Sequence, residues 1–334
     1  MKENKVRLGI LGAGRIVARI MEDMHHAENV EVMAIAAREL ERAKEAAERY
    51  HITYAYGSYL ELAQSKEVDL VYIATPHPFH AQQAMLMMDH GKHVICEKPM
   101  AINHYEVQQM IDCAQKNKVF LMEAMWTRFL PCVQELMRMI RDGVIGEVRN
   151  VFGEFSWHAQ NYDPADRVFD LALAGGGLLD LGVYPLMLCM QILGSKPEKV
   201  QSLCRKSVEG VDMNTSVQMQ YKNGAVAQFF CGMDASGNDY MQIFGTKGYI
   251  VMPASWHTLC LEGQQEQEFT FNQGGEAYHY EFDHAAQCIL QGLMESPVMP
   301  LAESLAASQI CTSIRYEHGV LYPGEPTSDE CAGE

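Results

Sequence analysis

Short apolar runs alternate with amphipathic segments along the first third of the chain. Each run is followed by a stretch in which apolar residues recur every three to four positions, the spacing of a helix with one buried face. The apolar runs cover residues 6–11, 30–36, 70–74, 93–96 and 119–123. Strands that alternate with helices in this way predict a parallel, doubly wound α/β sheet.

The pattern changes after residue 124. Alternating apolar and polar positions, separated by turns such as Asn223-Gly224, predict an open-faced, mainly antiparallel sheet packed with helices. The strands of this region are expected over 147–156, 200–205, 216–221, 225–233, 240–244 and 249–252. The helices are expected over 131–142, 178–193, 278–295 and 301–318.

Composition excludes several classes of partner. The chain has 43 acidic against 26 basic residues, a net charge of -17, which repels nucleic acid and anionic membrane surfaces. We expect a small-molecule substrate and no membrane contact, since no apolar run reaches the length of a bilayer span. Ten cysteines without a C-x-x-C pair, and no signal-like segment before Val6, favour reduced thiols in a cytoplasmic protein.

Gly12-Ala13-Gly14 lies between the first predicted strand and the first predicted helix. Glycines in such a turn let the backbone approach a pyrophosphate held by the helix N-terminus. The match to G-x-G-x-x-G is incomplete, because Val17 stands where the third glycine belongs. With the flanking strands and the helix, the turn predicts a NAD(P)-binding Rossmann domain over 1–123. At 334 residues the chain exceeds one usual core, so we expect a substrate-binding and dimerisation domain over 124–334.

The end of the second predicted strand bears on the choice of cofactor. A site specific for NAD normally carries an acidic residue there, whereas this chain has Ala36-Ala37-Arg38. Arg42 follows four residues after Arg38, so the two guanidiniums share a helix face and can bind a 2′-phosphate. The alternative is a pair of solvated arginines among acidic neighbours. We favour NADP, with NAD possible as a second cofactor.

Glu97-Lys98-Pro99 interrupts a strand-like run, which places Lys98 at the carboxyl edge of the predicted sheet, where open α/β folds bind ligands. The alternative is that Glu97 and Lys98 are a surface ion pair in a loop, without a functional role. Pro99 biases Lys98 away from helical backbone angles and makes its peptide bond a candidate for the cis form. We interpret Lys98 as the chemical centre of the protein.

Three further patterns suggest chemistry. His77 and His80 lack the cysteine or carboxylate that would complete a metal site, so we expect no metal and assign His80 to the nicotinamide pocket. The glycine run at 175–177 brings the backbone close to another group. Asp180 and Tyr184, four residues apart, share one helix face and are either functional or a dipole-pairing acid and a core tyrosine.

Together these motifs resemble the glucose-fructose oxidoreductase/inositol dehydrogenase (Gfo/Idh/MocA) family over essentially the whole chain. Several segments, among them 121–129 and 295–304, resemble its dihydrodiol dehydrogenase branch, which also contains NADP-linked D-xylose dehydrogenases. The resemblance implies that Lys98 is the catalytic lysine, with Asp180 and Tyr184 as its partners. Many family members carry histidine at the position of Tyr184 and asparagine at that of His77. The implied cofactor-binding residues are Gly12, Gly14, Arg15, Ile16, Arg38, Arg42, Thr75, Pro76, His80, Glu97 and Lys98. The expected substrate-binding residues are Trp126, Arg128, Phe155 and Trp256.

The sequence thus predicts an NADP-dependent oxidoreductase that transfers hydride at a hydroxyl or carbonyl carbon of a cyclic diol or an aldose. The alternative is a non-catalytic NAD(P)-binding sensor of the same fold, which would not need Lys98, Asp180 and Tyr184. A zinc alcohol dehydrogenase would need a Cys/His cluster that the spacing does not supply. A homodimer is expected through the C-terminal sheet, with Phe229, Phe230, Met241 and Phe244 on its outer face.

Overall fold

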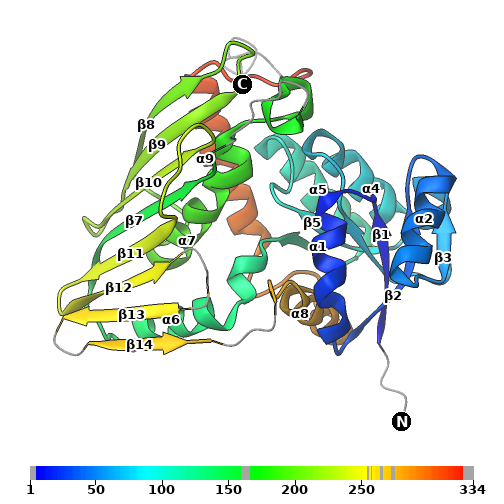
Figure 1. The fold of residues 1–334 in the computed structure, drawn as a ribbon, viewed down its shortest axis with the longest axis horizontal. Coiled ribbons are helices and arrows are strands. Elements are labelled where there is room, and N and C mark those ends of the chain that lie inside the picture. The colour runs from blue at the N-terminus through cyan, green and yellow to red at the C-terminus, as the bar shows by residue number, and fades with distance from the viewer. Residues whose placement is uncertain are drawn as a thin grey trace. The chain divides into compact units, whose positions relative to one another are not determined.

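The computed structural model describes residues 5–158, 166–253, 256, 258–263, 266–271 and 275–325. The chain divides into two compact units (Figure 1). Unit 1 comprises Met1–Ala101, Tyr105–Phe129 and Gln273–Leu305, and unit 2 comprises Ile102–His104, Leu130–Asn272 and Ala306–Glu334. Unit 1 therefore contains the expected first domain without 102–104, and adds 124–129 and a segment from near the C-terminus.

Unit 1 is built on a six-stranded parallel sheet in the order β3-β2-β1-β4-β5-β6. The chain reverses its direction of growth between β1 and β4, and this topological switch point is where doubly wound folds bind their ligands. The sequence predicted every strand of this sheet except β3. The strands are β1 (Val6–Leu11), β2 (Val30–Ala36), β3 (Tyr54–Tyr56), β4 (Leu70–Ile73), β5 (His93–Glu97) and β6 (Leu121–Ala124).

Helices cover both faces of this sheet. On one face, apolar side chains of β4 and β5 pack with those of α3, α4 and α5 in one continuous core. On the other face Tyr72 of β4 meets Phe282 of α8, with their ring centroids 5.1 Å apart. The helices are α1 (Arg15–Asp23), α2 (Leu40–Tyr50), α3 (Tyr59–Gln64), α4 (His80–Asp89), α5 (His104–Asn117) and α8 (His279–Leu290). Short 3₁₀ turns lie at η1 (Met24–His26), η2 (His77–Phe79) and η3 (Trp126–Phe129).

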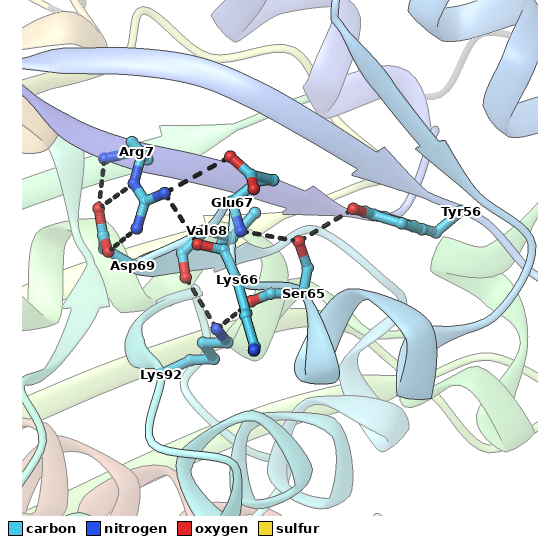
Figure 2. A network of polar contacts seen from close by, with 8 residues as sticks. All are labelled: Arg7, Tyr56, Ser65, Lys66, Glu67, Val68, Asp69 and Lys92. Atoms are coloured by element: carbon cyan, nitrogen blue, oxygen red, sulfur yellow. Dashed lines mark hydrogen bonds and ion pairs between the residues drawn. The ribbon is translucent and has the colours of Figure 1, made fainter.

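A polar network ties together the amino ends of β1, β4 and β5, at the edge opposite the ligand-binding edge (Figure 2). Asp69 accepts hydrogen bonds from Arg7 at Nη2 (2.7 Å) and Nε (2.9 Å). Lys92 donates to the carbonyl oxygens of Val68, at 2.8 Å, and of Ser65. The Arg7 hydrogen bonds hold the pKa of the Asp69 carboxyl below its ordinary 3.8, against an opposing effect of burial.

We expect Asp69→Asn to lower the free energy of unfolding by about 0.5–1 kcal/mol at neutral pH, a modest value because the ion pair is partly exposed. The folded-state pKa is depressed, so the stabilisation is present above the ordinary pKa and disappears as pH falls through the folded value. Urea unfolding of variant and wild type should therefore converge in acid. Asp112→Asn, at an exposed position of α5, is the control; a deficit that persists in acid would contradict the assignment.

Unit 2 is built on an eight-stranded sheet in the order β14-β13-β12-β11-β7-β10-β9-β8. All neighbours are antiparallel except β7 and β10, which run parallel. The strands are β7 (Val148–Ser156), β8 (Lys199–Lys206), β9 (Asp212–Gln220), β10 (Val226–Gly232), β11 (Tyr240–Gly245), β12 (Gly248–Pro253), β13 (Thr258–Gly263) and β14 (Gln267–Thr270). The fold class expected from the sequence is confirmed for both sheets, although β13 and β14 were not predicted.

The helical segments of unit 2 pack against one face of this sheet. They are α6 (Pro131–Arg141), the 3₁₀ turns η4 (Arg167–Phe169) and η5 (Leu171–Leu173), the π-helical turn η6 (Leu178–Gly182), α7 (Val183–Leu193), and α9 (Leu301–Glu317), which begins in unit 1. Contact of α7 with β7 is close: a Cβ on Gly153 would lie 3.0 Å from Pro185 Cβ and 2.4 Å from the Met241 sulfur. Gly153 is therefore needed for the helix to reach the sheet.

The outer face of this sheet is less apolar than expected from the sequence. Phe229 and Met241 are buried on the helix-covered face, whereas Phe230 and Phe244 lie half-buried on the opposite one. Successive side chains of a strand point to opposite faces, so adjacent residues such as Phe229 and Phe230 cannot share one. The half-buried aromatic residues of the outer face are Phe152, Phe230, Tyr240, Phe244 and Tyr249.

One segment of the described residues, Leu171–Leu193, is long and apolar enough by composition to cross a membrane, contrary to the sequence expectation. Of its most apolar window, 67% is buried within the structure. The core helix of a water-soluble protein passes the same test, so this segment by itself does not indicate a membrane protein.

Candidate active site

The turn between β1 and α1 fits a dinucleotide pyrophosphate. Gly12 has φ +116°, donates its N–H to the Ala36 carbonyl at 2.9 Å, and lies so close to Ala74 that a Cβ would come within 2.6 Å of its oxygen. Gly14 caps α1 without a side-chain hydrogen bond, and no acid stands in the first helical turn, which begins with Arg15 and Ile16. The helix N-terminus thus combines a positive dipole end with a backbone that only glycine allows.

Arg38 and Arg42 are both exposed and follow β2 closely, but they do not share a helix face as expected, because α2 begins at Leu40 and Arg38 precedes its N-cap, Glu39. The charges of both arginines act on the hydroxyl of Tyr59, a half-buried residue at the start of α3. Burial raises the pKa of the Tyr59 hydroxyl, and the positive charges of both arginines oppose that shift. Both positive charges thus act on the same region beside the end of β2, which suits an anionic group there.

The loops after β4 and β5 are joined by His80. Its ring is fully buried, with Nδ1 2.9 Å from the Pro99 carbonyl oxygen and Nε2 2.7 Å from that of Thr75. The neighbouring Thr75 hydroxyl donates to Gln83 Oε1 at 2.5 Å. His80 was expected in the wall of the nicotinamide pocket, but these contacts make it a brace that fixes the loops carrying Thr75, Pro76 and Lys98.

Lys98 follows β5 directly, and its peptide bond with Pro99 is cis. Its N–H donates to Glu97 Oε2 at 3.1 Å, and the other oxygen of Glu97 accepts a hydrogen bond from the Tyr72 hydroxyl. Tyr72 and Glu281 are fully buried beside Glu97. Burial, together with the Glu97 charge, raises the pKa values of both the Tyr72 hydroxyl and the Glu281 carboxyl well above their ordinary values.

A second acid, Glu123, lies near Lys98 from the adjacent strand β6. It is buried and accepts the Met100 N–H at 2.9 Å. Burial raises the pKa of its carboxyl, and the positive charge of Lys98 is among the effects that oppose the rise. Acidic groups on β5 and β6 thus lie near the backbone of Lys98. Glu97 was predicted to contact the cofactor, but both of its carboxylate oxygens already accept hydrogen bonds from the protein.

Asp180 lies on the π-helical turn η6, and Tyr184 lies in the first turn of α7, which continues it. Such turns are rare and frequently mark functional sites. Asp180 Oδ1 pairs with Arg167 Nη2 at 3.1 Å. The ring of Phe155 lies between Tyr184 and Trp256, at centroid distances of 5.1 and 6.1 Å. Unit 2 therefore brings together four of the residues predicted for catalysis and substrate binding.

Two other predicted substrate residues belong to unit 1. Trp126 stacks at a tilt on Tyr278, with ring centroids 4.9 Å apart. Arg128 differs from the expectation: its side chain is only 3% exposed, paired with Glu303 at 2.5 Å and donating to the Val298 carbonyl at 3.1 Å. Its guanidinium therefore binds groups inside unit 1, where it holds Val298 and the first turn of α9.

Sequence reasoning missed several residues of these sites. Glu123 is an acid near the carboxyl end of an apolar strand, as Glu97 is, and that position could have identified it. Tyr59, Arg167 and Glu281 carry no local pattern, because their partners are distant in the sequence. Among the described residues, no group of three or more histidine, cysteine or acidic side chains is placed to hold a metal ion.

A doubly wound parallel sheet with a glycine turn at its switch point, and a lysine at its carboxyl edge, defines an NAD(P)-binding oxidoreductase. The family model "Oxidoreductase family, NAD-binding Rossmann fold" (GFO_IDH_MocA) matches residues 6–125, and the GFO/IDH/MocA C-terminal domain matches residues 133–251. The chain belongs to the GFO/IDH/MocA oxidoreductase family and is a dehydrogenase. The resemblance noted in the sequence is confirmed.

Full-length relatives support the same conclusion. The chain is 37% identical to the trans-1,2-dihydrobenzene-1,2-diol dehydrogenase of Bos taurus and 35% identical to that of Homo sapiens, covering 95% of this chain and 98% of the relative in both cases. Among solved structures, it is similar to an aldose-aldose oxidoreductase from Caulobacter crescentus, with 25% identity, TM-score 0.86, and coverage of 94% and 98%. A 3-ketoreductase from Actinomadura kijaniata, solved with NADP, gives 25% identity, TM-score 0.80, and coverage of 93% and 97%.

Proposed function

We propose that this chain is an NADP-dependent dehydrogenase that transfers hydride between nicotinamide and a hydroxyl or carbonyl carbon of a cyclic diol or an aldose. The observation that carries the proposal is the position of Lys98. It stands at the carboxyl edge of the sheet two strands from the glycine turn, about 10 Å at the usual strand spacing. A dinucleotide bound at Gly12 spans that distance easily.

The oxidation of an alcohol needs a group that accepts the hydroxyl proton while the nicotinamide takes the hydride. Lys98 and Tyr184 are the candidates, and both side chains ordinarily have pKa values near 10. A cation that approaches a phenol favours the phenolate, so we assign the role of the base to Tyr184 and that of the cation to Lys98. Asp180, paired with Arg167, is assigned to orient Tyr184, four residues later, and does not itself accept the proton. In the reverse direction the same groups donate the proton to a carbonyl.

In unit 2 the substrate wall is assigned to the aromatic row of Tyr184, Phe155 and Trp256. A cyclic diol or a pyranose ring presents an apolar face edged by hydroxyls, which suits aromatic rings that bind the face and a phenol that can bind a hydroxyl. The similarity to a trans-1,2-dihydrobenzene-1,2-diol dehydrogenase and to an aldose-aldose oxidoreductase supports these two substrate classes.

NADP is favoured over NAD because Arg38 and Arg42 replace the acid that would hold the ribose hydroxyls. Both guanidiniums influence the Tyr59 hydroxyl, so a phosphate bound there would meet two cations and a hydrogen-bond donor. NAD remains a possible second cofactor, because the turn at Gly12 and the helix N-terminus serve both dinucleotides equally.

A panel of aldoses, polyols and dihydrodiols, followed by the absorbance of the reduced cofactor, tests the proposal. We expect turnover of trans-1,2-dihydrobenzene-1,2-diol or of D-xylose with NADP. Absence of turnover for every compound, by protein that still binds NADP, would contradict the proposed function and favour a sensor.

We also expect a homodimer through the outer face of the unit 2 sheet. Phe152, Phe230, Tyr240 and Phe244 lie half-buried on that face, and a second copy can cover them by the self-complementary packing of a two-fold dimer. Phe230→Glu should weaken the dimer at least tenfold, whereas Gln115→Glu, at an exposed position of α5 in unit 1, should not. Sedimentation at micromolar concentration is the measurement; a wild-type monomer would refute the expectation.

A further inference from the structure

The segment that carries Asp180 and Tyr184 is held at its amino end by a buried carboxylate. Asp212, the first residue of β9, is 1% exposed, and its Oδ2 accepts the Leu178 N–H at 2.5 Å. Leu178 is the first residue of the π-helical turn, whose N–H groups lack partners within the helix. The Thr215 hydroxyl donates to the same oxygen at 3.4 Å.

The glycine run at 175–177 makes room for this carboxylate. Gly176 has φ +129°, and a Cβ there would lie 2.0 Å from Asp212 Oδ1, a distance that no side chain could occupy. A Cβ on Gly175 would lie 2.5 Å from the Val168 carbonyl oxygen. On the other side, the Tyr322 hydroxyl donates to the Gly175 carbonyl at 3.1 Å. The group that the glycines approach is thus part of the protein itself.

The electrostatics around Asp212 are unusual for a structural acid. Its Oδ1 is buried without a hydrogen-bond partner. Burial raises the pKa of the carboxyl to about 7, although the Leu178 N–H and the charge of Arg315 oppose the shift. Replacing such a group by an apolar residue is often neutral or stabilising, so stability alone gives no reason to keep it.

The other titratable groups that face Asp212 do not change their protonation state around pH 7. Arg315 of α9 is paired with Glu325 at 2.7 Å and remains charged. The pKa of the Cys231 thiol on β10 is raised well above its ordinary value, and those of Cys204 on β8 and of the Tyr322 hydroxyl are also raised. Within this group, Asp212 is the one whose charge changes across neutral pH.

We propose that Asp212 is a positioning residue for hydride transfer: its carboxylate fixes Leu178, and thereby the turn that presents Asp180 and Tyr184. Leu178 lies two residues before Asp180 and six before Tyr184, less than two helical turns. A shift of one ångström at Leu178 therefore displaces both side chains, and misplacement on that scale can cost about 10²-fold in rate. This inference rests on the proposed roles of Asp180 and Tyr184.

Asp212→Ala removes the acceptor and should reduce the single-turnover rate of hydride transfer about 10- to 100-fold, with NADP affinity unchanged. The substrate is D-xylose or trans-1,2-dihydrobenzene-1,2-diol, whichever the wild type oxidises. Val217→Ala, a buried packing change in the same strand, is the matched control and should lower thermal stability without slowing hydride transfer. Equal rates for Asp212→Ala and Val217→Ala would overturn the proposal.

Asp212→Asn keeps the shape and an acceptor, and provides the test should the alanine variant fail to fold. At about pH 9 the wild-type carboxylate holds Leu178 by a charge-assisted bond, so the wild type should be about fivefold faster than the Asn variant. At about pH 5 both side chains are neutral and the two rates should converge. Lys98 and Tyr184 titrate in both proteins, so their effect cancels in the ratio of the wild-type rate to the Asp212→Asn rate. A ratio near one at every pH would overturn the proposal.

Amide hydrogen exchange separates this inference from the proposed function, because it needs no substrate. The amides of 178–184 should exchange about tenfold faster in Asp212→Ala than in Val217→Ala, and faster in Asp212→Asn than in the wild type at about pH 9. A wild type inactive on every substrate would contradict the proposed function alone. Unchanged exchange in the Asp212 variants would contradict the positioning role, whatever the activity.

Discussion

Lys98→Met should reduce the rate of hydride transfer by about 10²- to 10⁴-fold, the usual cost of losing one acid/base group. Methionine keeps most of the aliphatic stem and removes only the ammonium, so folding should survive. The N–H of residue 98 can still donate to Glu97, because that bond uses the backbone. The affinity for NADP should change little, since the residues proposed to bind its phosphates and adenosine are those of the glycine turn and Arg38.

Two measurements on the same sample decide the role of Lys98. NADP affinity is titrated by fluorescence, and the rate is taken from single-turnover hydride transfer. Lys116→Met, on the exposed side of α5, makes the same chemical change elsewhere in unit 1 and should leave both values unchanged. If Lys98→Met binds cofactor normally and is slowed less than tenfold, the lysine is a bystander and the site has been misjudged.

Arg38→Ala should weaken NADP binding about 10- to 100-fold, the equivalent of one or two charge-assisted hydrogen bonds. NAD binding should change by less than threefold, because NAD lacks the 2′-phosphate that the guanidinium would bind. The selectivity for NADP over NAD therefore falls by an order of magnitude or more. Replacing Arg42 as well should extend the loss, since both guanidiniums lie near Tyr59.

Arg49→Ala is the control for the arginine variants, because it removes the same charge from the last turn of α2. Dissociation constants for both cofactors are measured by fluorescence titration at one fixed ionic strength, since salt screens these charges. An equal loss of NADP and NAD affinity in Arg38→Ala would mean that the arginine shapes the loop and does not recognise a phosphate.

In unit 1, the spacing of residues along the chain predicted strand ends but not contacts between distant segments. The sequence placed Lys98 at a strand end, because an apolar run followed by Glu97 and Pro99 fixes where the strand stops. It could not place Glu281 beside Glu97, since those residues are 184 positions apart and no periodicity links α8 to β5. Arg128 shows the same limit: the arginine was visible in the sequence, but its partner Glu303 was not.

Unit 2 shows the complementary limit, for strands. In β10, successive side chains point to opposite faces of the sheet, a local property that by itself places Phe229 and Phe230 on different faces. Which of the two faces is covered by α7 depends on packing over Gly153, which no local pattern records. Strands β3 and β14 have only three and four residues, too few for a periodic signal to distinguish them from loop.

The sequence by itself determined the succession of strands and helices, the glycine turn, the pair of arginines after β2, and the lysine after β5. These features depend on neighbours in the chain, where backbone sterics and side-chain period act directly. The tertiary structure decided which buried acids surround Lys98, that His80 braces two loops, and that Asp212 lies beneath Leu178. Those contacts join distant segments, and their energies depend on burial and on partners that exist only once both sheets have formed.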